Sequence, residues 1–249
     1  MEFCNRKLDS AFEFIAQSDF DIFCLQEVPE KFLERLKTLS CSIAFCTDAD
    51  IVSAKNTKRI FLVILSAYPI TGESEIAFPD YVSSLRSRLF TFLMRPFNIS
   101  GIKNHHSFFV DVELPEGRMR VYNLHLILAS QPTWRLKEFE ETMTQCNTAC
   151  PNIVCGDFNT LETPYIAPLN WIFGGRMTDA LFCHRERIHI EKCFTAHALI
   201  NALRGMVTHP LSHSQLDHIL VSNSFSIKNA EVIPNRFGSD HHPIRMEIC

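Results

Sequence analysis

Apolar residues recur at helical spacing in two short segments near the start of the chain, with an extended apolar run between them. Residues 7–17 carry their apolar side chains on one helical face, which predicts an amphipathic helix. The run 21–28 is short and continuously apolar, as in a strand that is buried on both faces. Pro29 begins a second helical pattern that continues to Leu39. The chain is therefore predicted to begin helix, strand, helix.

Most of the remaining chain has the pattern of strands. The predicted strands are 41–46, 59–66, 88–94, 107–114, 118–127, 152–155, 216–222, 227–233 and 243–248. Pro115-Glu-Gly-Arg118 is a turn signal, which predicts a hairpin of the strands on either side of it. Residues 134–147 have one further helical pattern. The segments 67–105 and 160–215 are predicted to form variable loops over a cleft, with two short helices in the second.

Mixed strands with helices at both ends predict an α/β fold of packed layers. Hydrophobic residues make up 46% of the chain, enough to bury a large core without disulfides or metals. No repeat and no Pro/Gly-rich linker divides the sequence, so residues 1–249 are predicted to form a single domain.

The net charge of −4 argues against tight, non-specific binding to long nucleic acid, which usually requires a basic surface. Arg86, Arg88 and Arg95 are a candidate local basic patch, although arginines at this spacing are more often part of a solvated strand or loop. No apolar run approaches the ~20 residues that span a bilayer. We therefore expect no membrane span, and we assume a monomer.

None of the ten cysteines forms a C-x-x-C pair, and several lie inside apolar runs, as Cys24 does. Cys146, Cys150 and Cys155 match no common zinc-ligand spacing. The start of the chain lacks the apolar stretch of a signal peptide. These features predict an intracellular, cytoplasmic protein with reduced cysteines.

Polar residues follow several predicted strands, at the places where α/β proteins usually bind ligands. Glu27 ends a buried run, where a carboxylate needs a partner such as a metal ion or a salt bridge. Asn123 and His125 lie two positions apart and share one face of their strand, either lining a cleft or buried in a core.

Two further groups carry acid–base chemistry. In Gly156-Asp157-Phe158-Asn159, an extended backbone would project Asp157 and Asn159 to one side, as a proton acceptor for water and a donor to a phosphoryl oxygen. Gly-Asp is also ordinary turn chemistry. Asp217 and the pair Asp240-His241 can hold an imidazole in one tautomer beside a metal ligand.

The order of these motifs resembles the endonuclease/exonuclease/phosphatase superfamily. Leu25-Gln26-Glu27-Val28 resembles its first acidic motif, 156–159 its G-D-x-N motif and Ser239-Asp240-His241 its terminal S-D-H. Residues 123–125 resemble the strand that supplies an Asn or His to the substrate phosphate, and Asp217 the Asp before the last strands. The resemblance implies the deoxyribonuclease-I-like fold, a four-layer α/β/β/α sandwich with two mixed, largely antiparallel sheets.

The resemblance also implies a bound Mg²⁺ or Mn²⁺. Glu27 and Asp240 would hold it, Glu27 directly, since hard divalent cations prefer carboxylate oxygens. The superfamily normally opens with a strand whose Asn helps to bind the metal, but only a few residues precede Asn5 here. Asn5 is therefore either a metal ligand on a shortened strand or the N-cap of the first helix.

The same resemblance implies the catalytic roles. Asp157 would orient or deprotonate the attacking water, and Asn159 and His125 would donate hydrogen bonds to the phosphoryl oxygens. His241, oriented by Asp217, would stabilise the developing negative charge or transfer a proton. Metal and fixed donors would together neutralise charge in the transition state, usually the largest catalytic effect.

The predicted function is a phosphodiesterase, with nucleic acid or its ends as the favoured substrate because this is the superfamily's commonest substrate class. A phospholipid or an inositol phosphate is the alternative substrate. A catalytically inactive binding module that keeps the fold is the alternative of another class, and the short N-terminus favours it. Asp240-His241-His242 also spells the D-H-H signature of another phosphoesterase family, which requires Asp-rich motifs upstream that this chain lacks.

Overall fold

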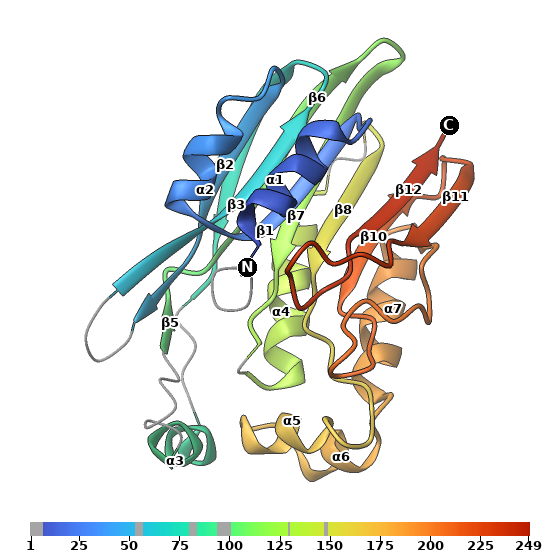
Figure 1. The fold of residues 1–249 in the computed structure, drawn as a ribbon. Coiled ribbons are helices and arrows are strands. Elements are labelled where there is room, and N and C mark those ends of the chain that lie inside the picture. Colours follow the sequence, from blue (N-terminus) through green and yellow to red (C-terminus); the bar gives the residue numbers. More distant parts are fainter. Residues whose placement is uncertain (1–6, 53–56, 80–83, 94–100, 129, 147–148) are drawn as a thin grey trace.

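A computed structural model describes residues 7–52, 57–79, 84–93, 101–128, 130–146 and 149–249 (Figure 1). Its helices are α1 (Leu8–Gln17), α2 (Glu30–Leu36), α3 (Leu85–Leu93), α4 (Pro132–Met143), α5 (Pro168–Ile172), α6 (Met177–Leu181) and α7 (Arg185–Ala196). Its strands are β1 (Ile22–Pro29), β2 (Ser42–Val52), β3 (Thr57–Ser66), β4 (Ile70–Ala77), β5 (Gly101–Lys103), β6 (His106–Leu114), β7 (Gly117–His125), β8 (Asn152–Asp157), β9 (Leu199–Asn201), β10 (Asp217–Ser222), β11 (Ile227–Val232) and β12 (Ile244–Ile248). None of the helices in the described part of the chain has the length and apolar character of a bilayer-spanning segment.

The strands form two large sheets and one separate pair. The first sheet has the order β1-β3-β2-β5 and is antiparallel throughout. The second has the order β4-β6-β7-β8-β10-β9, and only its β7–β8 pair is parallel. Among the described residues, β11 and β12 pair only with each other. The prediction of two largely antiparallel sheets is confirmed.

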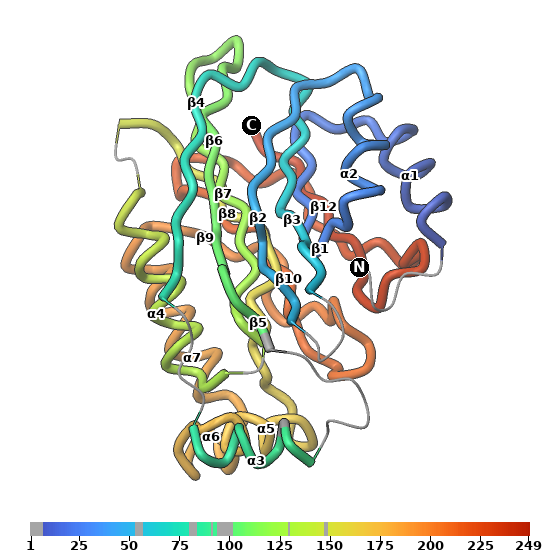
Figure 2. The backbone as a smooth tube through the Cα atoms, turned by 90° about the vertical axis from the view of Figure 1, so that its left-hand side faces the viewer, coloured from blue at the N-terminus to red at the C-terminus, as the bar shows by residue number. Residues whose placement is uncertain are grey.

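Helices cover the outer face of each sheet, so the molecule has four layers (Figure 2). α1 and α2 pack on the first sheet through one hydrophobic cluster. α4 and α7 pack on the second sheet through another, and a third cluster fills the space between the sheets. This confirms the α/β/β/α sandwich that the resemblance implied.

Alternating positions of the central strands face opposite sides of each sheet, as the pleat requires. In β3, Ile64 lies between the sheets, whereas Val63 packs under α1 and α2. In β7, Val121 lies between the sheets, whereas Tyr122 packs under α4 and α7. Asn123, two positions after Val121, therefore faces the first sheet.

The strand predicted at 88–94 is wrong, because this segment belongs to helix α3 as far as Leu93. Helix α3 packs against α5 and the residue that follows it. Phe90 meets the ring of Phe173 edge-on at 5.7 Å between centroids, and the guanidinium of Arg86 lies 4.6 Å above the ring of Trp171. Arg86 also donates a hydrogen bond to the Gly175 carbonyl at 2.6 Å. Its guanidinium group is therefore engaged in the contact between α3 and the α5 region. Arg95, the third member of the candidate basic patch, lies outside the described residues.

The segments predicted to be loops contain more regular structure than expected. β4 lies within 67–105 and forms the edge of the second sheet, while α5, α6, α7 and β9 all lie within 160–215. β4 carries Thr71, Glu73 and Glu75 on exposed positions, so it lacks the apolar run by which the other strands were found. Edge strands often carry charges of this kind.

A cleft of about 1250 Å³ separates β1 from β12 and continues into the end of the second sheet. Its walls include Cys24 of β1, Ile219 of β10 and Met246 of β12, all only half-buried. A sealed, empty cavity of this size would cost roughly 30 kcal/mol at about 24 cal/mol per Å³. Domains have only about 5–15 kcal/mol of net stability. The space is therefore an open cleft and not a packing void.

Gly156 lies where the backbones of β7 and β8 approach closely. It pairs with Leu124 in the parallel ladder, and a Cβ atom at this position would lie 1.9 Å from the Leu124 carbonyl oxygen. Its φ of 148° also disfavours other residues. A glycine is therefore required directly before Asp157.

We expect Gly156→Ala to lower the free energy of unfolding by about 2–5 kcal/mol, because the methyl group must push two strands apart. The matched control is Gly72→Ala, whose Cβ would have only ordinary contacts at 3.6 Å and beyond. Urea denaturation of both variants checks this. Equal, small effects of the two substitutions would contradict the close approach.

Candidate active site

Side chains from neighbouring strands meet at one end of the second sheet. β8 lies between β7 and β10, and the ladders pair Asp157 of β8 with His125 of β7 and with Asp217 of β10. The loop before β12 brings His241 to the same place. All but one of the predicted site residues line the common cleft, namely Glu27, His125, Asp157, Asn159, Asp217, Asp240 and His241. Asn5 lies outside the described residues.

A β-bulge places Glu27 at this cleft. The ladder between β1 and β3 shifts register between Leu25 and Val28, so Gln26 and Glu27 form the bulge. Glu27 has a φ of 54°, in the left-handed region that residues other than glycine rarely adopt. Its backbone N–H donates to the Asp48 carboxylate at 3.2 Å.

Asn123 holds this bulge from the opposite sheet. Its Nδ2 donates to the carbonyl oxygens of Leu25 and Val63, at 3.0 Å each, and its Oδ1 accepts a hydrogen bond from Gln26 Nε2 at 2.6 Å. The side chain is fully buried. Of the two polar residues on this face of β7, Asn123 is therefore part of the scaffold and His125 is the one at the cleft.

The two site histidines are held in the same way. His125 Nδ1 lies 2.9 Å from Asp48 Oδ2, and His241 Nδ1 lies 2.8 Å from Asp217 Oδ2. Asp48 has no exposed surface, and its Oδ1 has no hydrogen-bond partner in the described part of the chain. Because each Nδ1 faces its carboxylate, each ring directs Nε2 towards Asp157.

The neighbouring carboxylates keep both rings charged. Burial lowers the pKa of His125, but Asp48, Asp157 and Glu27 outweigh it and raise this pKa to about 10. Burial likewise opposes the charge on His241, yet Asp217 and other carboxylates raise its pKa to about 10. At neutral pH both rings are therefore imidazolium ions with an N–H donor at Nε2.

Asp157 lies between these two donors. Its Oδ2 is 3.9 Å from His125 Nε2 and 4.0 Å from His241 Nε2. Burial raises the pKa of Asp157 to about 6, and Asp217 adds to this effect although the two imidazolium charges oppose it. The carboxyl group is thus ionised at pH 7 and remains basic enough to accept a proton.

The backbone at Asn159 is left-handed, with a φ of 50°, so the expected extended conformation is wrong. The turn is stabilised by the Asn159 N–H, which donates to Asp157 Oδ1 at 2.8 Å. Asn159 Nδ2 donates one hydrogen to the Leu126 carbonyl at 2.8 Å, which fixes the amide group beside the end of β7. Asp157 and Asn159 are still brought together, but by a local turn.

The donor set fits a divalent cation. The two imidazolium groups are surrounded by more carboxylates than they can neutralise. The five carboxylates are Glu27, Asp48, Asp157, Asp217 and Asp240. Asp48 and Asp217 are hydrogen-bonded to histidines, and Asp157 lies between them. Glu27 and Asp240, to which the resemblance assigned the cation, both line the cleft and carry the oxygen ligands that a hard cation takes.

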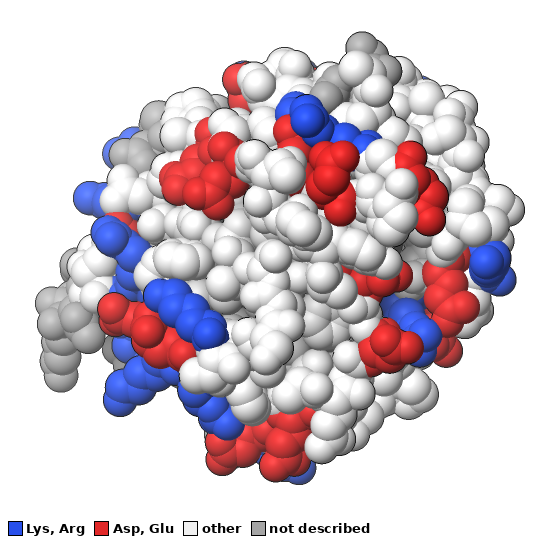
Figure 3. Space-filling model, turned by 90° about the horizontal axis from the view of Figure 1, so that it is seen from above, with Lys and Arg blue, Asp and Glu red and all other residues white. Residues whose placement is uncertain are grey.

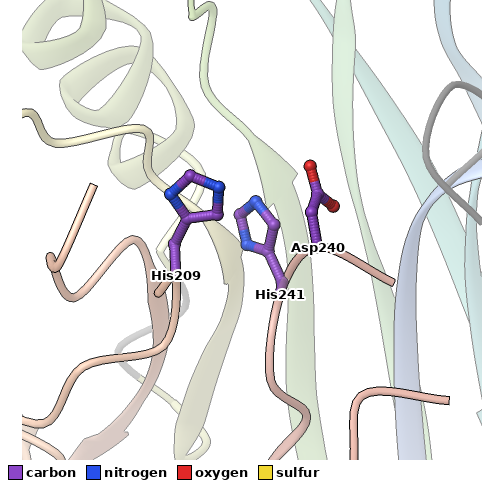
Figure 4. Close-up of side chains that lie close together, drawn as sticks. All are labelled: His209, Asp240 and His241. Carbon is purple, nitrogen blue, oxygen red and sulfur yellow. The ribbon is translucent and has the colours of Figure 1, made fainter. Parts of the chain in front are cut away.

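His209 belongs to the same cluster, although the sequence reasoning did not select it. Its ring centroid lies 4.7 Å from that of His241 (Figure 4). Burial lowers the pKa of His209, and the charge on His241 lowers it further. Asp48 was missed as well. Neither residue is part of the motifs from which the site was predicted.

The architecture and the cluster define a layered α/β protein with a carboxylate–imidazolium site. The sequence matches the Endonuclease/Exonuclease/phosphatase family over residues 2–241, and the chain belongs to this family. The family comprises hydrolases of phosphoesters that generally use divalent metals. No curated protein gives a significant match to the sequence.

Solved structures agree with this fold at low sequence identity. An endonuclease/exonuclease/phosphatase from Beutenbergia cavernae superposes with a TM-score of 0.67 at 15% identity, over 96% of this chain and 64% of that chain. A mannosyl-6-phosphatase from Bacteroides thetaiotaomicron gives 0.60 at 16% identity, over 98% and 91%. ANGEL2, a 2′,3′-cyclic phosphatase in complex with adenosine-2′,3′-vanadate, gives 0.56 at 14% identity, over 90% and 78%. The chain thus spans just under two thirds of the Beutenbergia protein.

We expect Asn123→Leu to lower the free energy of unfolding by about 2–4 kcal/mol, because two buried carbonyl groups and the Gln26 amide lose their partner. The variant should also bind divalent cations more weakly, since the bulge that carries Glu27 is released. Asn229→Leu, on an exposed position of β11, is the matched control. Chemical denaturation and calorimetric titration with Mn²⁺ measure the two effects. Unchanged stability would contradict the role of Asn123 as the link between the sheets.

Proposed function

We propose that the chain, acting as one domain, is a Mg²⁺- or Mn²⁺-dependent phosphodiesterase that acts on nucleic acid or its ends. The observation that carries this proposal is the convergence of two imidazolium Nε2 donors on one buried carboxylate of raised pKa. Fixed N–H donors suit the non-bridging oxygens of a phosphoryl group, and a carboxylate between them suits a water molecule in line for attack.

In this mechanism Asp157 accepts a proton from water while the water oxygen forms a bond to phosphorus. His125 Nε2 and the second hydrogen of Asn159 Nδ2 donate to non-bridging oxygens. As the ester bond breaks, His241 Nε2 donates its proton to the leaving oxygen, and Asp217 keeps the ring in position. The proton taken by Asp157 and the proton given by His241 balance over one turnover.

Glu27 and Asp240 would hold the metal ion. When bound, the ion neutralises negative charge on the phosphoryl group. The bulge at Glu27 matters here, because it directs the carboxylate to the cleft instead of into the helical layer. Asn5, proposed from the resemblance as a further ligand, would have to approach from the segment before α1.

The proposed substrate class rests on a ligand of one structural neighbour and on the charge of this chain. The adenosine-2′,3′-vanadate bound to ANGEL2 supports a nucleotide phosphoester for this fold. On the face seen in Figure 3, Lys and Arg side chains stand in small groups beside acidic groups. With a net charge of −4, this distribution favours an end or a short single strand over a long duplex. The mannosyl-6-phosphatase makes a sugar phosphate the second candidate.

We expect metal-dependent turnover that EDTA abolishes and that Asp157→Ala and His241→Ala each reduce by at least about 10²–10⁴-fold, the usual contribution of acid–base groups. The assay is hydrolysis of a panel that holds adenosine 2′,3′-cyclic phosphate, a 5′-phosphotyrosyl oligonucleotide, mannose 6-phosphate, sphingomyelin and an inositol polyphosphate. Activity that survives chelation or either substitution would refute the mechanism. Absence of turnover on the whole panel would favour the binding-module alternative.

We expect Asp48→Asn to lower kcat by about 10- to 100-fold, as is typical when the orienting partner of a site residue is lost. Without Asp48 the pKa of His125 falls towards its ordinary value, so the ring loses its charge as the pH rises through neutrality. The loss should therefore be larger at pH 8 than at pH 6.

The matched control is Asp50→Asn, two residues along the same strand, where the carboxylate binds Arg59 at 2.8 Å and Asn104 at 2.6 Å. Its kcat should stay within about twofold of the wild type, because Asp50 is not among the residues that line the cleft. A pH-independent loss in Asp48→Asn would count against its action through His125.

A further inference from the structure

His209 stands next to His241 but is held quite differently. Its ring faces that of His241 with an interplanar angle of 40°, and it lines the same cleft as Asp157. Its Nδ1 is not directed at a carboxylate. Instead, Nδ1 lies 3.2 Å from the backbone nitrogen of Ser212 and 2.7 Å from the Ser212 hydroxyl.

This contact fixes the tautomer of His209. A backbone N–H can only donate, so Nδ1 must offer its lone pair to Ser212. A neutral imidazole has a single N–H, which therefore lies on Nε2. Ser212 is almost fully buried, at 3% exposure, so water does not compete for the contact. His209 thus presents an N–H group, and not a lone pair, at its other ring nitrogen.

Several hydrogen bonds hold the segment that carries His209. The His209 backbone forms a two-way bridge with Ser214, and the Thr208 hydroxyl accepts the backbone N–H groups of Leu216 and Asp217 at 3.0 Å each. The Thr208 carbonyl accepts the His242 N–H at 2.7 Å. The donor on His209 is therefore positioned relative to both Asp217 and the loop of His241, as preorganised recognition requires.

A metal site is the competing explanation. One ring nitrogen of His209, one of His241 and a carboxylate oxygen of Asp240 lie within 4.8 Å of one another. Figure 4 shows the three side chains close together, and all three line the cleft. Two histidines and a carboxylate can bind a transition metal. However, Asp217 occupies Nδ1 of His241, and the Ser212 N–H leaves a proton on Nε2 of His209. Ligation through Nε2 would require the His209 proton to move to Nδ1, against the N–H of Ser212, because a ligating nitrogen must be deprotonated.

We propose that His209 is a substrate-binding residue, a neutral N–H donor for an oxygen next to the scissile phosphate. This inference rests on the proposed function and deepens it. The ring of His209 is held by Ser212 and not by a carboxylate, so its Nε2–H suits an uncharged acceptor. The substrate is therefore a phosphoester whose neighbouring group carries a hydroxyl, ether or carbonyl oxygen, as a nucleoside or a sugar does.

The tautomer is measured directly by long-range ¹H–¹⁵N NMR of the histidine rings in the whole protein, with the His209 signals assigned by their loss in His209→Gln. We expect an unprotonated Nδ1 and a protonated Nε2, unchanged when Mg²⁺ or Zn²⁺ is added. Loss of the Nε2 proton on addition of either metal would assign His209 to a metal site and overturn the proposal.

Kinetics test the substrate contact. With whichever panel member the wild type hydrolyses, His209→Ala should lower kcat/KM by about 10-fold, mainly through KM, as expected for one neutral hydrogen bond. His209→Gln keeps an N–H donor and should recover most of the loss. The Mg²⁺ concentration for half activation should stay within about twofold. The control is His213→Asn, an exposed histidine of the same loop.

Two outcomes overturn the proposal in kinetics: no change in KM for His209→Ala, or a loss that saturating Mg²⁺ restores. A wild type that hydrolyses nothing would refute the proposed function instead. In that case adenosine binding by wild type and His209→Ala, measured by calorimetry, decides the matter for His209. Equal affinities of the two proteins for adenosine, or no binding to either, would reject the proposed role of His209.

Discussion

The hydrogen bonds of Asn123 join the two sheets at the point where the site is built. A side chain from β7 in the second sheet satisfies two carbonyl oxygens and one side-chain amide of the first sheet. Leu25 and Val63 pair directly before the bulge, and buried carbonyl groups without partners are costly. The left-handed backbone at Glu27 is thus stabilised from outside its own strand. The position of the carboxylate depends on how the two sheets are packed.

At the same end of the sandwich, each buried imidazolium group is paired with carboxylates. Each imidazolium group has one carboxylate behind it, Asp48 for His125 and Asp217 for His241, and both rings face a third, Asp157. The two orienting carboxylates come from different sheets, because Asp48 belongs to β2 and Asp217 to β10. Buried charges of this kind are stable only when each has a partner. The arrangement therefore forms only when the complete sandwich is assembled.

The fold class and most of the cleft could be predicted because the motifs lie at the ends of apolar runs. Glu27, Asp157 and His241 each follow or precede such a run, and their order along the chain carried the resemblance. Asp48 could not be predicted in this way. It lies at a register shift of β2 between Thr47 and Ala49, and only the fold shows that the bulge turns it towards His125. His209 depends on a contact with Ser212 that is a property of one turn. The polar edge strand β4 and the apolar helix α3 were misjudged for the same reason, since their surroundings decide their structure and not their own pattern.

The cleft between β1 and β12 also affects how stability is distributed. Among the described residues no backbone ladder joins the β11–β12 pair to either large sheet, so this pair is attached mainly by side-chain packing. Units held in this way open locally at a lower free energy than the core strands, and their amide protons exchange sooner. The loop between β11 and β12 carries Asp240 and His241, whereas Asp157 and Asp217 lie on central strands of the second sheet. We therefore expect the wall of the site that carries Asp240 and His241 to open more readily than the facing wall on the second sheet.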